Sequence, residues 1–146
     1  MPTLQMRQQR IALAGQAARG QDVVVRCTMC HAIQGAGAEV GPALDGWALG
    51  KSNEVIATAI LQPDAEIAHG YGGTTIRTTD GLTIQGLLIK EGDPLMIRSM
   101  GGVTQIVPAN RVSAREPMSR SLMMSAAQLG LAAQDVADLI AFLRTR

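Results

Sequence analysis

The sequence predicts a mainly α domain that is interrupted by a small antiparallel β-unit. Two observations support this fold class. Apolar residues near the end of the chain recur with the 3.6-residue period of a helix. In the middle of the chain, short β-branched runs are separated by Asp-Gly and Gly-Gly turns, as in β-hairpins. The helical domain is assigned to residues 1–70 and 114–146, and the inserted β-unit to residues 71–113.

Two helices are expected in the first half of the chain. Residues 5–26 are rich in Ala, Gln and Arg, and Gly15 and Gly20 are expected to divide this helix into two pieces. A second helix is expected from Asn53 to Leu61, because Ser52 is a suitable N-cap and a proline follows shortly after the last leucine. The glycine-rich stretch between these helices indicates a long loop.

A third helix is predicted near the C-terminus from a single apolar face. The members of this face lie at i, i+3, i+4 and i+7: Val136, Leu139, Ile140 and Leu143. Asp135 at its start and Arg144 at its end carry the charges that a helix dipole favours at those positions. The expected order of elements is therefore helix, loop, helix, β-unit, helix.

The β-unit is expected to contain four or five short strands. The turn Asp80-Gly81 between two β-branched runs is a strong hairpin signal. Two further turns are indicated at Gly92-Asp93 and Gly101-Gly102. The strands expected around these turns are residues 74–78, 82–89, 95–98 and 103–107.

The most informative motif is the pentapeptide Cys27-Thr28-Met29-Cys30-His31. It has the form C-x-x-C-H, which is the attachment signature of a c-type haem. The thiols of Cys27 and Cys30 can add to the two vinyl groups of the porphyrin, and His31 then lies under the iron as the proximal ligand. The chain has only two cysteines and two histidines, and three of these four residues form the motif. One covalently attached haem c is therefore expected.

The motif has two alternative interpretations. A redox-active dithiol would be expected in a βαβ context, whereas the residues before Cys27 are predicted to be helical. A zinc site could take Cys27, Cys30 and His31 with His69 as the fourth ligand. Adjacent cysteine and histidine ligands in one short loop fit a tetrahedron poorly, so the haem interpretation is preferred.

The composition agrees with a buried macrocycle and excludes some function classes. Apolar residues make up 47% of the 146 residues but aromatic residues only 2%, so a porphyrin would supply bulk that the core lacks. A net charge of +1 gives no strong attraction to nucleic acid or to anionic membranes. No Ser/His/Asp set, phosphate-binding glycine loop or basic–aromatic stripe supports a hydrolase, a nucleotide-binding protein or a nucleic-acid-binding protein.

The expected location is periplasmic or otherwise extracytoplasmic. No apolar run reaches the roughly 18–20 residues that span a bilayer, so no membrane span is expected. Residues 1–10 are polar and lack the apolar core of a signal peptide. Since haem attachment of this type usually takes place outside the cytoplasm, either a leader has been removed or the chain is a domain of a larger exported protein.

The first and last thirds of the chain resemble a class I cytochrome c. In that family a helix leads into C-x-x-C-H, a G-P-x-L segment follows, and a C-terminal helix crosses the first one. Here the segment is Gly41-Pro42-Ala43-Leu44. The resemblance implies that the carbonyl of Pro42 accepts a hydrogen bond from the ring of His31 and orients it. It also implies that Gly20 packs against Phe142 where the two helices cross.

With the β-unit included, residues 18–146 resemble the haem-binding domain that is abundant in planctomycetes and verrucomicrobia. The matching segments are Gln62-Pro63-Asp64-Ala65, Gly70-Tyr71, Thr79-Asp80-Gly81, Val107-Pro108 and Ser121-Leu122-Met123. The resemblance implies that Met123 is the sixth iron ligand. In the family a proline follows this methionine, whereas here the next residue is Met124, so Met118, Met124 and His69 remain alternative ligands.

These observations predict a monohaem cytochrome that transfers one electron at a time. Ligation by His31 and Met123 would close the iron to substrates, and the partner would be an exported dehydrogenase, another cytochrome or an oxidase. The alternative is a haem enzyme or sensor with an open sixth position for peroxide or a diatomic gas, with His69 or Arg115 as the polar group beside it. Whether the chain is an enzyme is therefore left open, with an electron carrier favoured. A third expectation, compatible with the first, is that the β-unit docks a partner.

Overall fold

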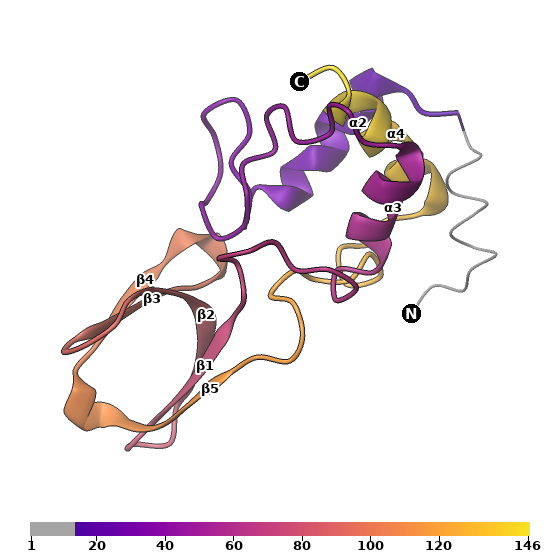
Figure 1. Cartoon of the computed structure of the whole chain (residues 1–146). Coiled ribbons are helices and arrows are strands. Elements are labelled where there is room, and N and C mark those ends of the chain that lie inside the picture. The colour runs from indigo at the N-terminus through magenta and orange to yellow at the C-terminus, as the bar shows by residue number, and fades with distance from the viewer. Residues whose placement is uncertain (1–13) are drawn as a thin grey trace.

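The computed structural model describes residues 14–146, and the expected helical residues 5–13 lie outside this range. Figure 1 shows helices gathered at one end of the molecule and strands at the other. The α-helices are α2 (Ala17–Val23), α3 (Asn53–Leu61) and α4 (Ala133–Leu143). Three short 3-10 helices cover Val24–Cys27, Met100–Gly102 and Ala109–Arg111. No helix in the described range is both long and apolar enough to cross a membrane.

The prediction of a mainly α fold is wrong. Of the described chain, 28% is helical and 22% is strand, with three short α-helices and a five-stranded antiparallel sheet. The error has two physical causes. Within the described residues, the inserted sheet is longer than expected, because its last strand extends to Pro117. In addition, the long segments 28–52 and 118–132 form mostly turns and bends, so the helical end of the molecule contains much irregular chain.

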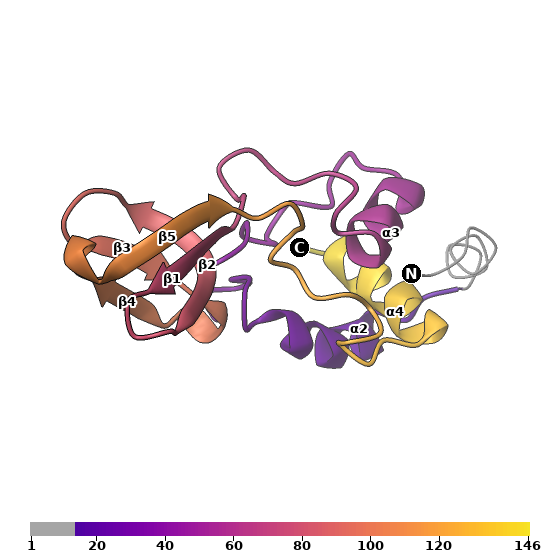
Figure 2. The ribbon, with the colours of Figure 1, turned by 90° about the horizontal axis from the view of Figure 1, so that it is seen from below.

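The crossing of α2 and α4 organises the helical end (Figures 1 and 2). A Cβ atom added to Gly20 would lie 2.0 Å from the carbonyl oxygen of Asp138 and 2.6 Å from the Cβ of Phe142. Because such distances are far below van der Waals contact, only glycine allows the helices to approach this closely. The expected contact between Gly20 and Phe142 is confirmed.

A buried carboxylate ties the same crossing together. Asp138 Oδ1 accepts the backbone N–H of Gln16 at 2.8 Å, and Asp138 Oδ2 pairs with Arg19 at 2.5 Å. Gln134 also donates to Asp138 Oδ1 at 2.9 Å. Burial alone raises the pKa of Asp138, but the hydrogen bonds from Gln134 and Gln16, together with the charge of Arg19, outweigh it and lower that pKa. The carboxylate of α4 thus satisfies a backbone donor at the start of α2.

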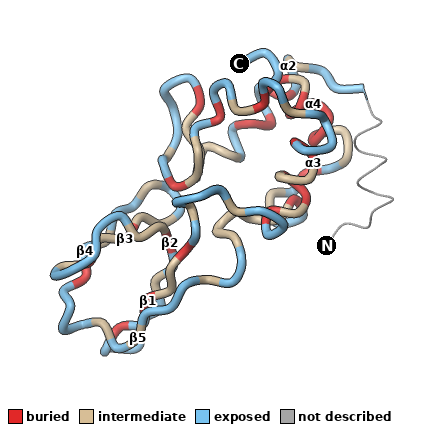
Figure 3. Tube along the Cα trace, in the orientation of Figure 1, coloured by how far each residue is buried: buried red, intermediate tan, exposed pale blue. Residues whose placement is uncertain are grey.

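The other two helix predictions are confirmed in detail. Helix α3 spans Asn53–Leu61, and the hydroxyl of Ser52 accepts the N–H of Val55 at 3.2 Å, as an N-cap does. Helix α4 buries the predicted face, which includes Val136 and Leu139. Both helices contribute to one hydrophobic core, together with side chains from the loops on either side of them. Figure 3 shows this concentration of buried residues at the helical end.

Five strands form a curved antiparallel sheet, the β-unit of the structure (Figures 1 and 2). They are β1 (Thr74–Thr78), β2 (Thr83–Lys90), β3 (Leu95–Arg98), β4 (Thr104–Val107) and β5 (Val112–Pro117), in the order β4-β3-β2-β1-β5. The predicted hairpin at Asp80-Gly81 joins β1 to β2, and Gly81 adopts the positive φ of 87° that this turn requires. Strand β5 extends past residue 113, the expected end of the insertion, because it pairs with β1.

The β-unit has its own small core. The buried members are Ile76, Leu95, Ile97 and Val107, with Ile84, Leu88 and Val112 packed against them. This cluster is separate from the core of the helical end. Register shifts between Arg77 and Thr78 and between Leu88 and Lys90 bend the strands, which lets the sheet curve around such a small set of side chains.

Candidate haem site

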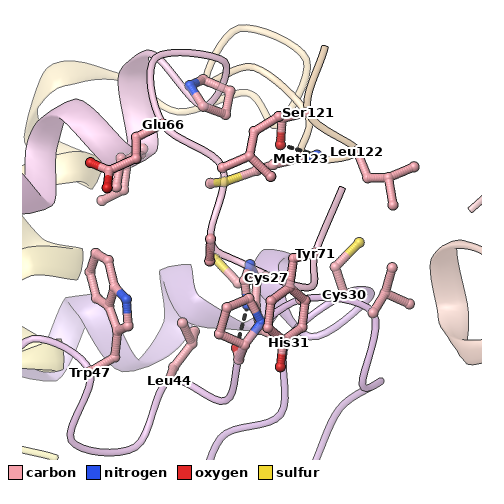
Figure 4. A pocket seen from close by; sticks show the side chains of 18 of the residues that line it. Cys27, Cys30, His31, Leu44, Trp47, Glu66, Tyr71, Ser121, Leu122 and Met123 are labelled. Atoms are coloured by element: carbon pink, nitrogen blue, oxygen red, sulfur yellow. Dashed lines mark hydrogen bonds between the residues drawn. The ribbon is translucent and has the colours of Figure 1, made fainter. Parts of the chain in front are cut away.

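An apolar cavity lies between the helices and the irregular segments (Figure 4). Its lining residues come from five parts of the chain: Cys27, Cys30 and His31; Val40, Gly41, Pro42 and Leu44 with Trp47; Ala59 and Ile60 of α3 with residues of the segment 63–71; Ser121, Leu122 and Met123; and Leu139 and Leu143 of α4. The cavity therefore brings together the C-x-x-C-H motif, Pro42 and Met123, which are far apart in the sequence. Its walls are mostly apolar, as a porphyrin face requires.

His31 is held at the cavity by its neighbours. Its Nδ1 lies 2.6 Å from the carbonyl oxygen of Pro42. A carbonyl can only accept, so Nδ1 donates in this hydrogen bond. In the neutral imidazole, Nε2 then has the lone pair that can bind a metal. This contact is the one that the resemblance implied for Pro42, and it fixes the orientation of the ring.

Gly41 holds the same ring from the side, a role that the sequence did not reveal. A Cβ atom at Gly41 would lie 2.5 Å from Cε1 and 2.9 Å from Nδ1 of His31. The backbone N–H of Gly41 also donates to the carbonyl of Cys30 at 2.6 Å. The loop thus folds back onto the motif so closely that only glycine fits against the imidazole. In the sequence, the position of Gly41 directly before Pro42 was the signal that could have indicated this role.

The thiols of Cys27 and Cys30 form no disulfide and are partly buried at the cavity. Burial and the neighbouring Cys30 raise the pKa of Cys27 to about 11, and Arg26 lowers it by less. Burial also raises the pKa of Cys30. A disulfide oxidoreductase requires a thiolate with a lowered pKa, so this environment does not suit the redox-dithiol alternative.

The zinc alternative needs a cluster of ligands. Among residues 14–146, no three His, Cys, Asp or Glu side chains come together in an arrangement that could hold a metal ion. His69 is exposed and is not one of the residues that line the cavity, although its neighbours Ala68 and Tyr71 are. The four residues considered for zinc therefore do not form one site in this structure.

The candidates for the sixth ligand are placed differently by the fold. Met123 lines the cavity, across from Cys27 and His31 in Figure 4. Met118 packs against Gly73 at the edge of the β-unit, and neither Met118 nor Met124 is among the cavity-lining residues described. Arg115, considered as a polar group beside an open iron, is an exposed residue of β5 that pairs with Glu91. The geometry thus brings Met123 and His31 to one cavity and leaves the other candidates outside it.

The cavity also offers polar groups for the edge of a porphyrin. Trp47 and Tyr71 line it, and neither the indole N–H of Trp47 nor the hydroxyl of Tyr71 has a hydrogen-bond partner among the described residues. Such donors normally find a partner when they are partly buried. Two thiols, a histidine with a free Nε2, apolar walls and two unpartnered donors together fit a haem with its carboxylate-bearing edge.

The fold and the site define a haem protein of the C-x-x-C-H type, and comparison with known families agrees. A family model described as cytochrome c matches residues 17–146. The chain therefore belongs to the cytochrome c family, whose members bind haem and transfer electrons. No curated protein sequence matches the chain.

Proposed function

We propose that the chain is a monohaem c-type cytochrome in which His31 and Met123 are the two axial ligands. The observation that carries this proposal is that one apolar cavity is lined by both attachment cysteines, by His31 bound to the carbonyl of Pro42, and by Met123 opposite. One C-x-x-C-H motif uses both cysteines of the chain, which supports a single haem attached through two thioether bonds.

Haem in such a site supplies an iron that gains and loses one electron. The protein residues set the conditions for that step. Pro42 and Gly41 fix the orientation of His31, which would hold the iron through Nε2. The apolar walls, which include Leu44 and Leu139, exclude water from the haem face. Ligation by histidine and methionine raises the reduction potential and leaves no position open for a substrate.

The partner is proposed to be another redox protein: an exported dehydrogenase, a second cytochrome or an oxidase. The net charge of +1 provides little long-range steering, so the encounter should depend only weakly on ionic strength. We place the domain in the periplasm or another extracytoplasmic compartment, because cytochrome c domains are typically found there. The matching segments and the β-unit support membership of the planctomycete and verrucomicrobial type of haem-binding domain.

The proposal is tested by producing the chain with haem-maturation machinery. The intact mass should exceed the sequence mass by one haem, and acid–acetone should not extract the pigment. The ferric spectrum should be low-spin and should contain the methionine–iron charge-transfer band. A mass equal to that of the bare polypeptide would contradict covalent attachment. A five-coordinate, high-spin iron would instead favour the haem enzyme or sensor.

A further inference from the structure

The segment that carries Met123 has no regular secondary structure, yet it reaches the cavity with a defined geometry. Residues 118–123, the methionine loop, contain bends but no helix or strand and lie between β5 and α4. We propose that Asp64 and Gly73 are positioning residues that hold the methionine loop, and with it Met123, against the cavity. This inference rests on the proposed ligation of the iron by Met123.

Asp64 fixes the middle of the loop. Its Oδ1 accepts the backbone N–H of Ser121 at 2.7 Å, and the hydroxyl of Ser121 in turn accepts the backbone N–H of Met123 at 3.0 Å. Asp64 follows Pro63, which is buried just after α3. A hydrogen bond to an ionised carboxylate is roughly twice as strong as a neutral one. Two successive hydrogen bonds therefore connect the end of α3 to the backbone of Met123.

Gly73 fixes the start of the loop. Its carbonyl oxygen accepts the N–H of Met118 at 2.9 Å. A Cβ atom at Gly73 would lie 2.6 Å from Sδ of Met118 and 2.8 Å from Cγ of Leu122. Leu122 lines the cavity and is the direct neighbour of Met123. A side chain at Gly73 would therefore displace the leucine next to the proposed ligand.

Both contacts come from one stretch of chain, residues 63–73, which also lines the cavity through residues such as Ile67 and Tyr71. This stretch thus provides part of the cavity wall and holds the loop opposite His31. A thioether is a weak ligand, so the fraction of molecules in which the sixth position is open depends on how well the protein positions the sulfur. Asp64 and Gly73 are expected to keep that fraction small.

The test uses the holoprotein as wild type and as Asp64→Ala, Gly73→Ala and Met123→Ala, with Asp64→Asn and Gly72→Ala for comparison. The first readout is the methionine–iron charge-transfer band of the ferric protein. The second is the apparent affinity for imidazole, which competes with methionine for the sixth position. Asp64→Ala and Gly73→Ala should weaken the band and raise the apparent imidazole affinity about tenfold, because that affinity follows the population of the open state.

Gly72→Ala and Asp64→Asn are the matched controls. Gly72→Ala should behave as wild type, because a Cβ atom at Gly72 meets nothing within 4 Å. Asp64→Asn keeps a carbonyl acceptor without the charge, so its effect should be smaller than that of Asp64→Ala. If Gly73→Ala does not fold, the exposed Asp64 decides the question.

Two outcomes overturn the inference. If Asp64→Ala and Gly73→Ala lower the melting temperature but leave the band and the imidazole affinity unchanged, the two residues only stabilise the fold. If the wild-type protein has no band and its imidazole affinity is unaffected by Met123→Ala, the proposed ligation by Met123 fails, and the positioning role fails with it. The presence of the band in the wild type distinguishes the first failure from the second.

Discussion

The carbonyl oxygen of Gly73 accepts the backbone N–H of Met118 at 2.9 Å. The two ends of the β-unit therefore lie next to each other. Strand β1 begins directly after Gly73, and β5 ends directly before Met118. The sheet also has its own buried cluster of side chains. An element with adjacent ends and a separate core has the properties expected of an inserted domain.

We predict that the β-unit can be removed without loss of haem attachment. Replacing residues 74–117 with Asn-Gly would join Gly73 to Met118 through a short turn of the kind found in hairpins. The C-x-x-C-H motif, Pro42 and the helical core would remain. Intact mass should still show one haem. If no linker of two to six residues gives a haem-loaded protein, the β-unit is part of the haem site and the proposed division is wrong.

The deletion should nevertheless change the surroundings of the attachment loop. The N–H of Gly101 in the β-unit donates to the carbonyl of Met29 at 2.7 Å, and Arg98 donates to the carbonyl of Glu39 at 3.2 Å. Without these contacts, the backbone carbonyls of the loop lose their donors and accept hydrogen bonds from water instead. Hydrogen exchange around residues 28–40 should therefore be faster in the deletion variant. Unchanged exchange would show that these contacts do not restrain the loop.

Ligation by Met123 predicts a specific pattern among four alanine variants. Met123→Ala should abolish the charge-transfer band and lower the reduction potential, because loss of the soft thioether favours the ferric state. Met118→Ala, Met124→Ala and His69→Ala should keep the band, since none of these residues is among those described at the cavity. Visible spectra and voltammetry measure both effects. A change of spin state in His69→Ala with no effect in Met123→Ala would instead indicate ligation by two histidines.

Local sequence patterns predicted the positions of individual helices and strands better than the overall share of helix and strand in the chain. Ser52 identified the start of α3, and Asp80-Gly81 identified the first hairpin, because both signals act over a few residues. The extension of β5 to Pro117 depends on pairing with β1, which no local pattern reports. The mainly α prediction failed because, in the described residues, it gave too little weight to irregular chain and strand.

The same distinction applies to the site. The motif of Cys27, Cys30 and His31 is contiguous, so the sequence alone indicated its chemistry. The hydrogen bond from the backbone N–H of Ser121 to the carboxylate of Asp64 joins residues that are 57 positions apart. It forms only because the end of α3 and the methionine loop meet in the folded chain. The contact of Gly41 with the imidazole likewise depends on how the loop returns to the motif. Such positioning contacts have no spacing rule that a single sequence can reveal.

The buried carboxylate of Asp138 should make the free energy of unfolding depend on pH. Its pKa is lowered in the folded protein, so the stabilisation is complete above the unfolded pKa of roughly 4 and is lost as the pH falls through the folded pKa. Asp138→Asn should reduce the free energy of unfolding at pH 7 by about 1–2 kcal/mol, since the side chain is fully buried but its partner Arg19 is half exposed to screening water. The difference from wild type should shrink below pH 4.

Chemical denaturation at pH 7 and at pH 3 measures this effect. Asp80→Asn is the matched control, because the pKa of Asp80 is also lowered, by hydrogen bonds from Thr78 and Arg111, but this carboxylate is exposed on the β-unit. The control should change stability little at either pH. Equal losses for Asp138→Asn at both pH values would show that the carboxylate acts through its shape and not through its charge.

Gly41 should be sensitive to substitution, because the imidazole of His31 fills the space that a side chain would need. Gly41→Ala would place a methyl group 2.5 Å from the ring of His31, so either the loop moves or the ring turns away from Pro42. Overpacking of this kind costs about 1–3 kcal/mol. A turned ring would also weaken the bond from Nε2 to iron. The holoprotein should therefore show a lower melting temperature and a fraction of high-spin iron, whereas Gly72→Ala should show neither. Wild-type spectra together with a lowered melting temperature would mean that the loop absorbs the clash and that Gly41 supports the fold without orienting His31.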